Sequence, residues 1–212
     1  MSTVSDVLND LTRKPDRRGD RALLDSVFDE CLVATVSTVV DGQPWVIPAL
    51  VVRDGNRLLI HGSTGAGALR HVAGGAPVAI SAFVLDGIVI AERQFDHSAN
   101  YRSAVVRGTC RTVERTDRAA ALDLFTDTLL PGRPAECPPH TASEVAATLV
   151  LELPITGDNW VAKHRSGPAA APEGDTWTGV IPVAQTFAPP ESDSSRAVPA
   201  SVARFVARRE LP

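Results

Sequence analysis

Apolar and polar residues alternate along the chain in short runs that are typical of β-strands. β-Branched, apolar segments occupy residues 31–39, 45–53, 57–61, 77–85 and 88–93. Asp-Gly pairs lie in three of the breaks between them, at residues 41–42, 54–55 and 86–87. Because Asp-Gly between apolar runs favours a tight hairpin turn, these strands are predicted to be antiparallel neighbours. With a further strand at residues 101–114, five or six strands would form a small barrel.

Segments with apolar residues at helical spacing predict helices around this barrel. They lie at residues 4–11, 21–30, 66–73, 116–130, 142–147 and 199–209. Asp20 and Thr116 are the expected N-cap residues of the second and fourth of these helices. Further extended segments are expected at residues 148–153, 160–164 and 177–183. The prediction is one mainly β domain at residues 1–183, followed by a Pro- and Ser-rich linker and a short helix at 184–212.

Composition and charge narrow the classes of function. Of the 212 residues, 44% are hydrophobic and 22% are charged, which is ordinary for a globular protein. The formal net charge of −4 argues against a nucleic-acid partner or a polybasic membrane surface. No apolar run approaches the roughly 20 residues that span a bilayer. Cys31, Cys110 and Cys137 are widely spaced, so we expect reduced thiols in a cytoplasmic protein rather than a disulfide or zinc framework.

The strongest candidate chemistry lies in residues 58–70, which read LLIHGSTGAGALR. An apolar strand opens here into Gly, Ser and Thr residues and then into a predicted helix. Glycines let a backbone approach a ligand closely, and the first N–H groups of a helix have no intrahelical partner. These features favour an anion site, with Arg70 as a nearby cation. An ordinary strand-to-helix connection remains the alternative, because the loop matches neither the Walker pattern nor a Rossmann fingerprint.

A second polar segment, FDHSANYRSAVV at residues 95–106, lies between two predicted strands. Together with the loop it resembles a known family. The matching segments are WVIPALV (45–51), LIHGSTG (59–65), LDGIVIA (85–91), HSANYRS (97–103) and GVIP (179–182). Over about residues 19–183 the chain is similar to the FMN-binding split-barrel family of pyridoxamine 5'-phosphate oxidase-like proteins. The resemblance is greatest to the flavin-nucleotide-binding branch that includes nitroimidazole-resistance reductases.

The resemblance implies a six-stranded antiparallel split barrel that forms a homodimer, with FMN bound at the dimer interface. The isoalloxazine would rest on the backbone of the second strand, and the loop with an arginine would bind the phosphate, whose charge needs convergent donors. His61 is the candidate catalytic residue. The expected cofactor-binding residues are Ile47, Pro48, Ala49, Leu50, His61, Gly62, Ser63, Thr64, Gly65, Gly67, Arg70, Tyr101, Arg102 and Ser103.

Two departures from the family pattern affect this expectation. Relatives usually carry an Arg or Lys where this chain has Ala66, Gly67 and Ala68. Losing one charge-assisted hydrogen bond costs about 1.5–3 kcal/mol, or about one to two decades of affinity. The pyridoxamine-phosphate oxidases proper also have an arginine near the position of Ile47. FMN therefore binds weakly or relies on other arginines, and oxidation of vitamin B6 is not favoured.

The histidines offer few other reactions. His61 ends a strand at the loop, where it either points at the flavin or substrate or is satisfied by backbone groups. His97 either contacts a ligand or orders the turn at residues 94–100. No set of histidines has metal-ligand spacing, so no metal site is expected. Ser63, His97 and Asp86 lack the G-x-S-x-G elbow of a serine hydrolase.

The sequence therefore favours an FMN-dependent oxidoreductase that acts on a small organic substrate, with NADH or NADPH as a candidate electron donor. In such proteins the cofactor carries the redox chemistry and the chain binds and orients it. A flavin-nucleotide carrier without turnover is one alternative. A relative that binds haem or a deazaflavin on the same barrel is the other.

Overall fold

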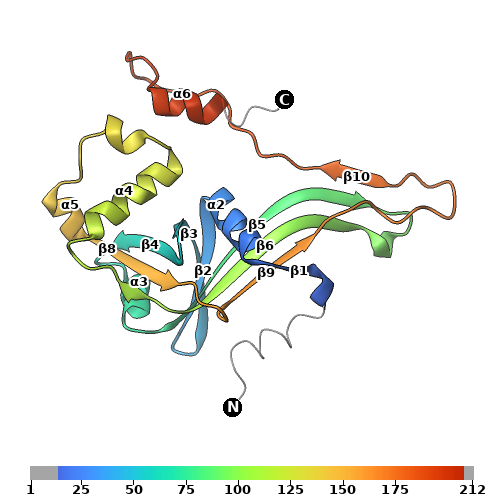
Figure 1. Cartoon of the computed structure of the whole chain (residues 1–212), viewed down its shortest axis with the longest axis horizontal. Coiled ribbons are helices and arrows are strands. Elements are labelled where there is room, and N and C mark those ends of the chain that lie inside the picture. The colour runs from blue at the N-terminus through green and yellow to red at the C-terminus, as the bar shows by residue number, and fades with distance from the viewer. Residues whose placement is uncertain (1–13, 208–212) are drawn as a thin grey trace.

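The computed structural model describes residues 14–207, and in this part of the chain a mostly antiparallel sheet curls into a half-barrel (Figure 1). The strand order is β1-β9-β6-β5-β2-β3-β4-β8-β7, and β10 pairs with β5. This architecture fits the predicted split barrel, with ten described strands rather than six. The strands are β1 (Arg18–Gly19), β2 (Val33–Val40), β3 (Gln43–Asp54), β4 (Arg57–Ser63), β5 (Pro77–Ile90), β6 (Ser98–Thr109), β7 (Arg111–Thr112), β8 (Thr148–Pro154), β9 (Trp160–Arg165) and β10 (Gly179–Pro182).

Helices flank this sheet at positions close to the predicted ones. They are η1 (Pro15–Arg17), α2 (Arg21–Glu30), α3 (Gly67–Ala73), η2 (Gln94–Asp96), α4 (Arg118–Leu129), η3 (Arg133–Glu136), α5 (Ala142–Ala147) and α6 (Ala200–Ala207). The helix expected at residues 4–11 lies outside the described residues. Asp20 caps α2 as predicted, since its carboxylate accepts the N–H of Leu23. Thr116 does not cap α4, because the N-cap position is Asp117, which makes no capping hydrogen bond through its side chain.

Two of the three predicted Asp-Gly hairpins are confirmed. Asp41 and Gly42 have φ angles of 50° and 75° between β2 and β3, which are the positive values that a tight hairpin turn requires. Gly55 has φ of 56° between β3 and β4. The third prediction is wrong. Gly87 pairs with Asn100 inside a continuous β5, and the Asp86-Gly87 pair marks a β-bulge between Leu85 and Gly87.

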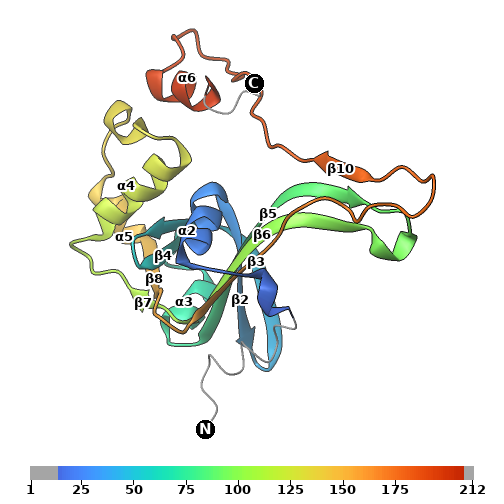
Figure 2. The same ribbon diagram turned by 45° about the vertical axis from the view of Figure 1, so that its right-hand side comes forward.

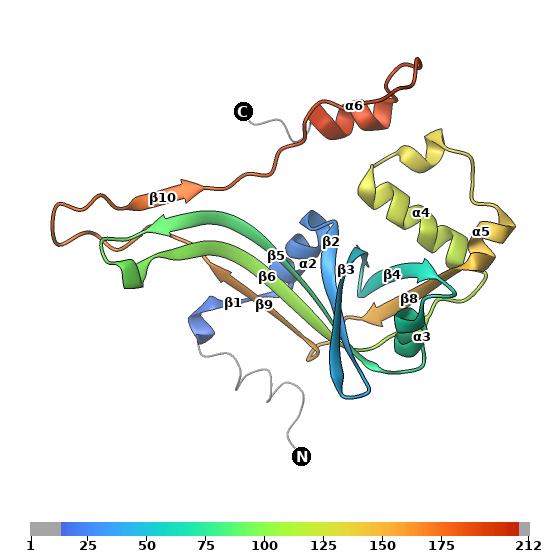
Figure 3. The same cartoon turned by 180° about the vertical axis from the view of Figure 1, so that it is seen from behind.

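The bulge allows β5 to continue beyond the barrel as one side of a long arm. Figures 1 and 3 show β5 and β6 projecting together, with β10 along the free edge of β5. A side chain on Gly87 would meet Val180 and Ile181 of β10 at 3.0–3.1 Å, so this glycine permits the third strand to approach closely. The chain turns at η2, near the far end of the arm.

The sheet buries a different helix on each of its two faces. On the inner face, Leu24, Val27 and Phe28 of α2 are almost fully buried in the barrel. Burial of one such side chain contributes about 1.5–3 kcal/mol. On the outer face, Leu122 and Phe125 of α4 pack against residues of β3, β4 and β8. Val33 and Val39 of β2 and Phe83 of β5 are more than half exposed on this outer face.

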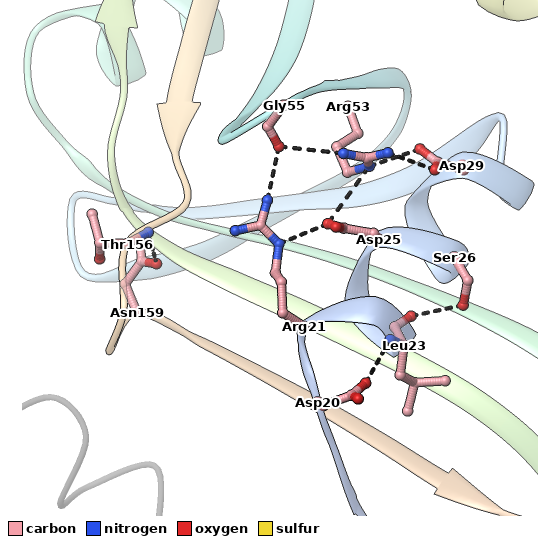
Figure 4. Close-up of polar contacts among 10 residues, drawn as sticks. All are labelled: Asp20, Arg21, Leu23, Asp25, Ser26, Asp29, Arg53, Gly55, Thr156 and Asn159. Carbon is pink, nitrogen blue, oxygen red and sulfur yellow. Dashed lines mark hydrogen bonds and ion pairs between the residues drawn. The ribbon is translucent and has the colours of Figure 1, made fainter.

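Ion pairs hold α2 against the turn between β3 and β4 (Figure 4). Arg21 donates to Asp25 at 2.7 Å and to the carbonyl of Gly55 at 2.8 Å. Arg53 forms a bidentate pair with Asp29, with N···O distances of 2.6 and 2.7 Å. These contacts join one helix face to a hairpin that is distant in sequence, and they determine how α2 enters the barrel.

Residues 183–199, which we call the strap, return from β10 across the molecule to α6 (Figure 2). The strap contains no helix or strand, and its first residue, Val183, donates to the carbonyl of Asp86 at 3.0 Å. At its far end, Glu136 of η3 accepts the N–H and the hydroxyl of Ser201 at 3.0 and 2.6 Å. The strap is thus attached to the arm at one end and to η3 at the other. No helix within residues 14–207 is long and apolar enough to cross a membrane.

Candidate functional site

The sheet register places side chains from seven strands in one row across the outer face. Paired residues of antiparallel strands point to the same face. The paired residues in this row are Val150–His61, Leu50–Val33, Phe83–Ser103 and Ser103–Lys163. The links from His61 to Leu50 and from Val33 to Phe83 continue the registers of the Val51–Ile60 and Thr35–Ser81 pairs. We call this set the outer row. It joins three segments that the sequence analysis selected separately, namely residues 47–50, the loop that begins at His61, and residues 101–103.

His61 lies at the end of the outer row that α4 covers. Its ring contacts Phe125 edge-on, with ring centroids 4.3 Å apart. The Nδ1 atom is buried and has no hydrogen-bond partner among the described residues. Burial lowers the pKa of the imidazole below its usual value of 6.5, because the charged form loses its hydration. The backbone therefore does not satisfy this ring nitrogen, and a neutral imidazole is the form that accepts a proton or binds a metal.

The loop after His61 is more ordered by its own contacts than the sequence indicated. The N–H groups of Thr64, Gly65 and Ala66 donate to the carbonyl of Ala147, the hydroxyl of Ser63 and the carbonyl of Ser63, at 2.9–3.1 Å. Only the first turn of α3 keeps N–H groups without a capping side chain. Arg70, one turn later, is exposed and has no ion pair among residues 14–207. Any phosphate contact of this loop therefore depends on the start of α3 and on Arg70.

The segment at residues 47–50 divides between the two faces of β3. Ile47 and Ala49 pack against the core around α2. Leu50 packs against the cluster around α4, and Pro48 is exposed on the same outer face. Only the backbone and the side chains of Pro48 and Leu50 are therefore available to a ligand on the outer face. Strand alternation accounts for this division.

The segment at residues 101–103 divides in the same way. Tyr101 and Ser103 share the outer face with Leu85 and Phe83, their partners on β5. Arg102 lies on the inner side, where it bonds to Asp86 and Glu30 at 2.8 Å each. These two carboxylates raise the pKa of the guanidinium further above its usual range. A phosphate would have to displace one of them, so the structure gives Arg102 a structural contact rather than a free positive charge.

A cavity of about 790 Å³ lies beside the outer row, and we call it the strap pocket. Its walls come from the end of α2, the start of β2, residues 83–86 of β5, Arg102 and residues 183–187 of the strap. Phe83 and Val33 belong both to the pocket and to the outer row, and their side chains are 71% and 59% exposed. Neither residue could be recognised from the sequence, because nothing in an apolar strand shows which of its residues lack a covering helix.

The remaining polar residues named from the sequence make separate contacts. His97 donates from Nδ1 to the carbonyl of Arg93 at 3.0 Å, a contact that orders the turn at the end of the arm. Ser63 accepts from Gly65, and Asp86 pairs with Arg102, so Ser63, His97 and Asp86 form no hydrolytic triad. Within the part of the chain that the structure describes, no three His, Cys, Asp or Glu residues are grouped to hold a metal ion.

Comparison with known families agrees with the fold and with the resemblance of the motifs. The family described as pyridoxamine 5'-phosphate oxidase matches residues 20–158. The chain belongs to this family. Among curated proteins, none matches the chain. The match ends before β9, β10 and the strap, so the family assignment concerns the barrel with α2 to α5.

Solved structures extend the comparison to most of the chain. An FAD- and haem-binding protein from Mycobacterium smegmatis is 37% identical, with a TM-score of 0.86 over 90% of this chain and 97% of that one. The flavocytochrome Anf3 from Azotobacter vinelandii is 27% identical, with a TM-score of 0.83 over 91% and 94%. A candidate 5-nitroimidazole antibiotic resistance protein from Bacteroides thetaiotaomicron shares the fold at 18% identity, with a TM-score of 0.58 over 68% and 84%.

Proposed function

We propose that the chain is a flavin-dependent redox protein whose flavin lies on the outer face of the barrel. The outer row carries this proposal, because it joins the loop, the second strand and the β6 segment on one surface. The relatives that are 37% and 27% identical are described as an FAD- and haem-binding protein and as a flavocytochrome. A flavin would supply the electron transfer, and the chain would bind and orient it.

FAD is a better candidate than the FMN expected from the sequence. The description of the 37% identical relative names FAD. The loop here lacks a basic residue at positions 66–68, and three of its N–H groups are already bonded. FMN would depend on this loop for its single phosphate, whereas FAD adds a second phosphate and an adenosine that bind elsewhere. A weak phosphate loop is therefore less costly for FAD.

The proposed roles of the residues follow from their places on the outer face. Pro48 and Leu50 support the isoalloxazine, with backbone groups of β3 near its edge. The start of α3 and Arg70 bind phosphate, since N–H groups without intrahelical partners and a guanidinium both favour an anion. Tyr101 and Ser103 close the site from β6. Arg102 is left out, because its guanidinium is already paired.

A haem is a second candidate cofactor, and one observation in this structure favours it. The Nδ1 atom of His61 is buried without a partner, and burial keeps the imidazole neutral. A neutral histidine is a common axial ligand of haem iron. His61 is therefore our candidate for such a ligand. Haem would add one-electron chemistry to a flavin protein.

A second copy of the chain is the proposed cover for the outer face. Val39 and Val46 are more than half exposed there and lie outside the strap pocket. Apolar patches of this kind on a single protein usually mark an interface. A homodimer would bury these residues and would exclude water from a flavin bound among them.

The absorption spectrum of the purified protein tests the proposal. We expect flavin bands near 370 and 450 nm, release of FAD on denaturation, and loss of the 450 nm band when NADPH or NADH is added. Arg70→Gln should weaken flavin binding by about one to two decades, as expected for one charge-assisted hydrogen bond. Arg93→Gln is the matched control, because Arg93 is an exposed arginine on the arm. A protein that binds neither FAD nor FMN would refute the flavin proposal.

The haem proposal has its own readout. A haem-loaded protein shows an intense absorption band at about 410 nm, and His61→Gln should remove or shift this band. His97→Gln is the control, because His97 contacts only the backbone of its own turn. An unchanged spectrum in His61→Gln would exclude His61 as the axial ligand while leaving the flavin proposal intact.

A further inference from the structure

The strap pocket combines apolar walls with a small polar group. Its apolar lining includes Phe83 and Val33 of the sheet and Val183 and Phe187 of the strap. The volume of about 790 Å³ lies within the range of about 300–1,000 Å³ that is usual for small-molecule sites. Phe83 is 71% exposed although it lines a cavity, so this aromatic ring has a free surface for a ligand. The pocket therefore has the shape and the apolar area to bind a ring compound.

The charges of the pocket exclude one class of ligand. Its three charged residues are Glu30, Asp86 and Arg102, and the guanidinium lies between the two carboxylates at 2.8 Å from each. The wall thus carries a net charge of −1 and no unpaired cation. An anionic ligand beside this wall would lose its hydration and would find no unpaired positive charge to replace it. Neutral compounds do not meet this penalty.

The strap provides a cover that is fixed at both of its ends. Val183 is bonded to Asp86 on the arm, and Ser201 is bonded to Glu136 on η3. Between these points, Phe187 contacts Phe205 of α6 edge-on, with ring centroids 4.9 Å apart. The ring of Phe187 is therefore held at the pocket by α6, which in turn is held by Glu136.

We propose that the strap pocket binds a neutral compound with a flat apolar ring, placed between Phe83 and the strap. Val33 and Phe83 also belong to the outer row, so such a compound would lie next to the surface proposed for the flavin. Its assignment as the substrate rests on the proposed function, whereas its binding does not. The substrate class is then a neutral quinone-like compound, which would take two electrons and two protons from a flavin reduced by NADPH or NADH and would leave as the hydroquinone.

A pair of fluorescent probes tests the binding directly. N-phenyl-1-naphthylamine is neutral, and 1-anilinonaphthalene-8-sulfonate has the same rings with one negative charge. We expect saturable binding of the neutral probe to the full-length protein, and at least about tenfold weaker binding of the sulfonate. Equal affinity for the two probes, or no saturable binding of the neutral one, would overturn the proposal.

Variants locate the probe. Phe187→Ala should weaken the neutral probe by about fivefold to tenfold, which is the scale of one aromatic contact. Trp177→Ala is the matched control, because Trp177 is an exposed aromatic residue that does not line the pocket. Glu136→Gln should also weaken binding, since it loosens the strap without changing the pocket wall. Binding that neither Phe187→Ala nor Glu136→Gln alters would place the probe elsewhere and refute the proposal.

The flavin content of the same preparation separates the two proposals. If a flavin-free protein binds the neutral probe, the pocket proposal stands but its assignment as a substrate site is refuted. A flavin-loaded protein that does not bind the neutral probe would retain the flavin proposal and refute the pocket.

Discussion

His61 could be selected from the sequence, but the property that makes it a candidate ligand or base depends on its surroundings in the fold. Its place at the junction of strand and loop is visible in the sequence. The burial of Nδ1 without a partner depends on α4, which brings Phe125 to the ring from a segment about sixty residues away. The resulting neutral imidazole is the chemical property that matters for a ligand or a proton. For this residue, the chemistry of the candidate site therefore depends on how far the fold removes the imidazole from water.

The pH dependence of stability should report this desolvation. Burial lowers the pKa of His61 in the folded protein, so the unfolded chain takes up a proton first as pH falls below 6.5. The folded protein should lose stability from about pH 6.5 downward until its own pKa is reached. His61→Gln should lose less free energy of unfolding between about pH 7.5 and pH 5.5, measured by urea denaturation. Equal losses in the two proteins would show that His61 is freely protonated when folded.

Helix α2 and strand β5 show why one predicted element boundary was confirmed and another was wrong. Helix α2 begins and ends where its cap and its apolar spacing indicated. Strand β5 continues through an Asp-Gly pair, because Gly87 is bonded to Asn100 and is covered by β10. The local turn preference was therefore overcome by pairing on both edges of the strand. Asp86, which lies at the bulge, forms an ion pair with Arg102 rather than a hairpin turn.

The cap of α2 gives a prediction at this scale. Asp20→Ala should lower the free energy of unfolding by about 1 kcal/mol, because the N–H of Leu23 loses its acceptor. Thermal or urea unfolding measures the change. Asp16→Ala is the control, since Asp16 is an exposed aspartate in η1, next to α2, and should change stability by less than about 0.5 kcal/mol. Similar losses in both variants would attribute the effect to net charge.

The contacts of Arg102 give a second prediction about stability. Arg102 joins the end of α2, through Glu30, to the bulge of β5, through Asp86. Its side chain is 27% exposed, so solvent screens part of the interaction, and Arg102→Leu should cost about 1–2 kcal/mol of unfolding free energy. Arg93→Leu should change little, because Arg93 has no ion pair among the described residues.

Flavin affinity distinguishes this structural contact from a direct one. Arg102→Leu should bind flavin as tightly as the unmodified protein at a temperature where both are folded. A loss of about tenfold or more in flavin affinity, without a loss of stability, would instead return Arg102 to the phosphate site.

At the scale of the whole molecule, the outer face is organised by what covers it. Helix α4 packs over the His61 end, the strap lines the pocket that contains Phe83, and Val39 and Val46 on the remaining outer face are more than half exposed. A surface with these three zones fits a flavin near α4, a ring compound under the strap and a second copy of the chain over the remainder. The proposals for cofactor, substrate and dimer thus concern neighbouring parts of one surface.

Two valines of almost equal exposure test the proposed dimer. Val46 lies on the open part of the outer face and is 57% exposed, whereas Val198 lies in the strap and is 54% exposed. Val46→Glu should halve the molecular mass measured by light scattering, because a charge would be buried without a partner in the interface. Val198→Glu should leave the mass unchanged. If Val46→Glu has the mass of the unmodified protein, the interface lies elsewhere.

Much of the fold could be predicted because it depends on local preferences. Alternating apolar residues, Asp-Gly turns at 41–42 and 54–55, and the cap at Asp20 each act over a few neighbouring residues. The antiparallel barrel and the positions of α2, α3 and α5 followed from them, whereas the family resemblance came from sequence motifs such as those at residues 59–65 and 97–103. The candidate loop was also visible, since its glycines and its helix start are adjacent in sequence.

Other properties depended on residues that are distant in sequence. The register of separate strands brought His61, Leu50 and Ser103 into one row, and alternation put Ile47 and Arg102 on the opposite face. Long-range pairing also carried β5 through Asp86-Gly87 and brought the strap over Phe83. The amino-acid sequence by itself determined which segments form strands and helices, because those preferences are local. Only the tertiary structure decided which side chains share a surface and which remain uncovered, because burial and pairing are properties of the packed chain.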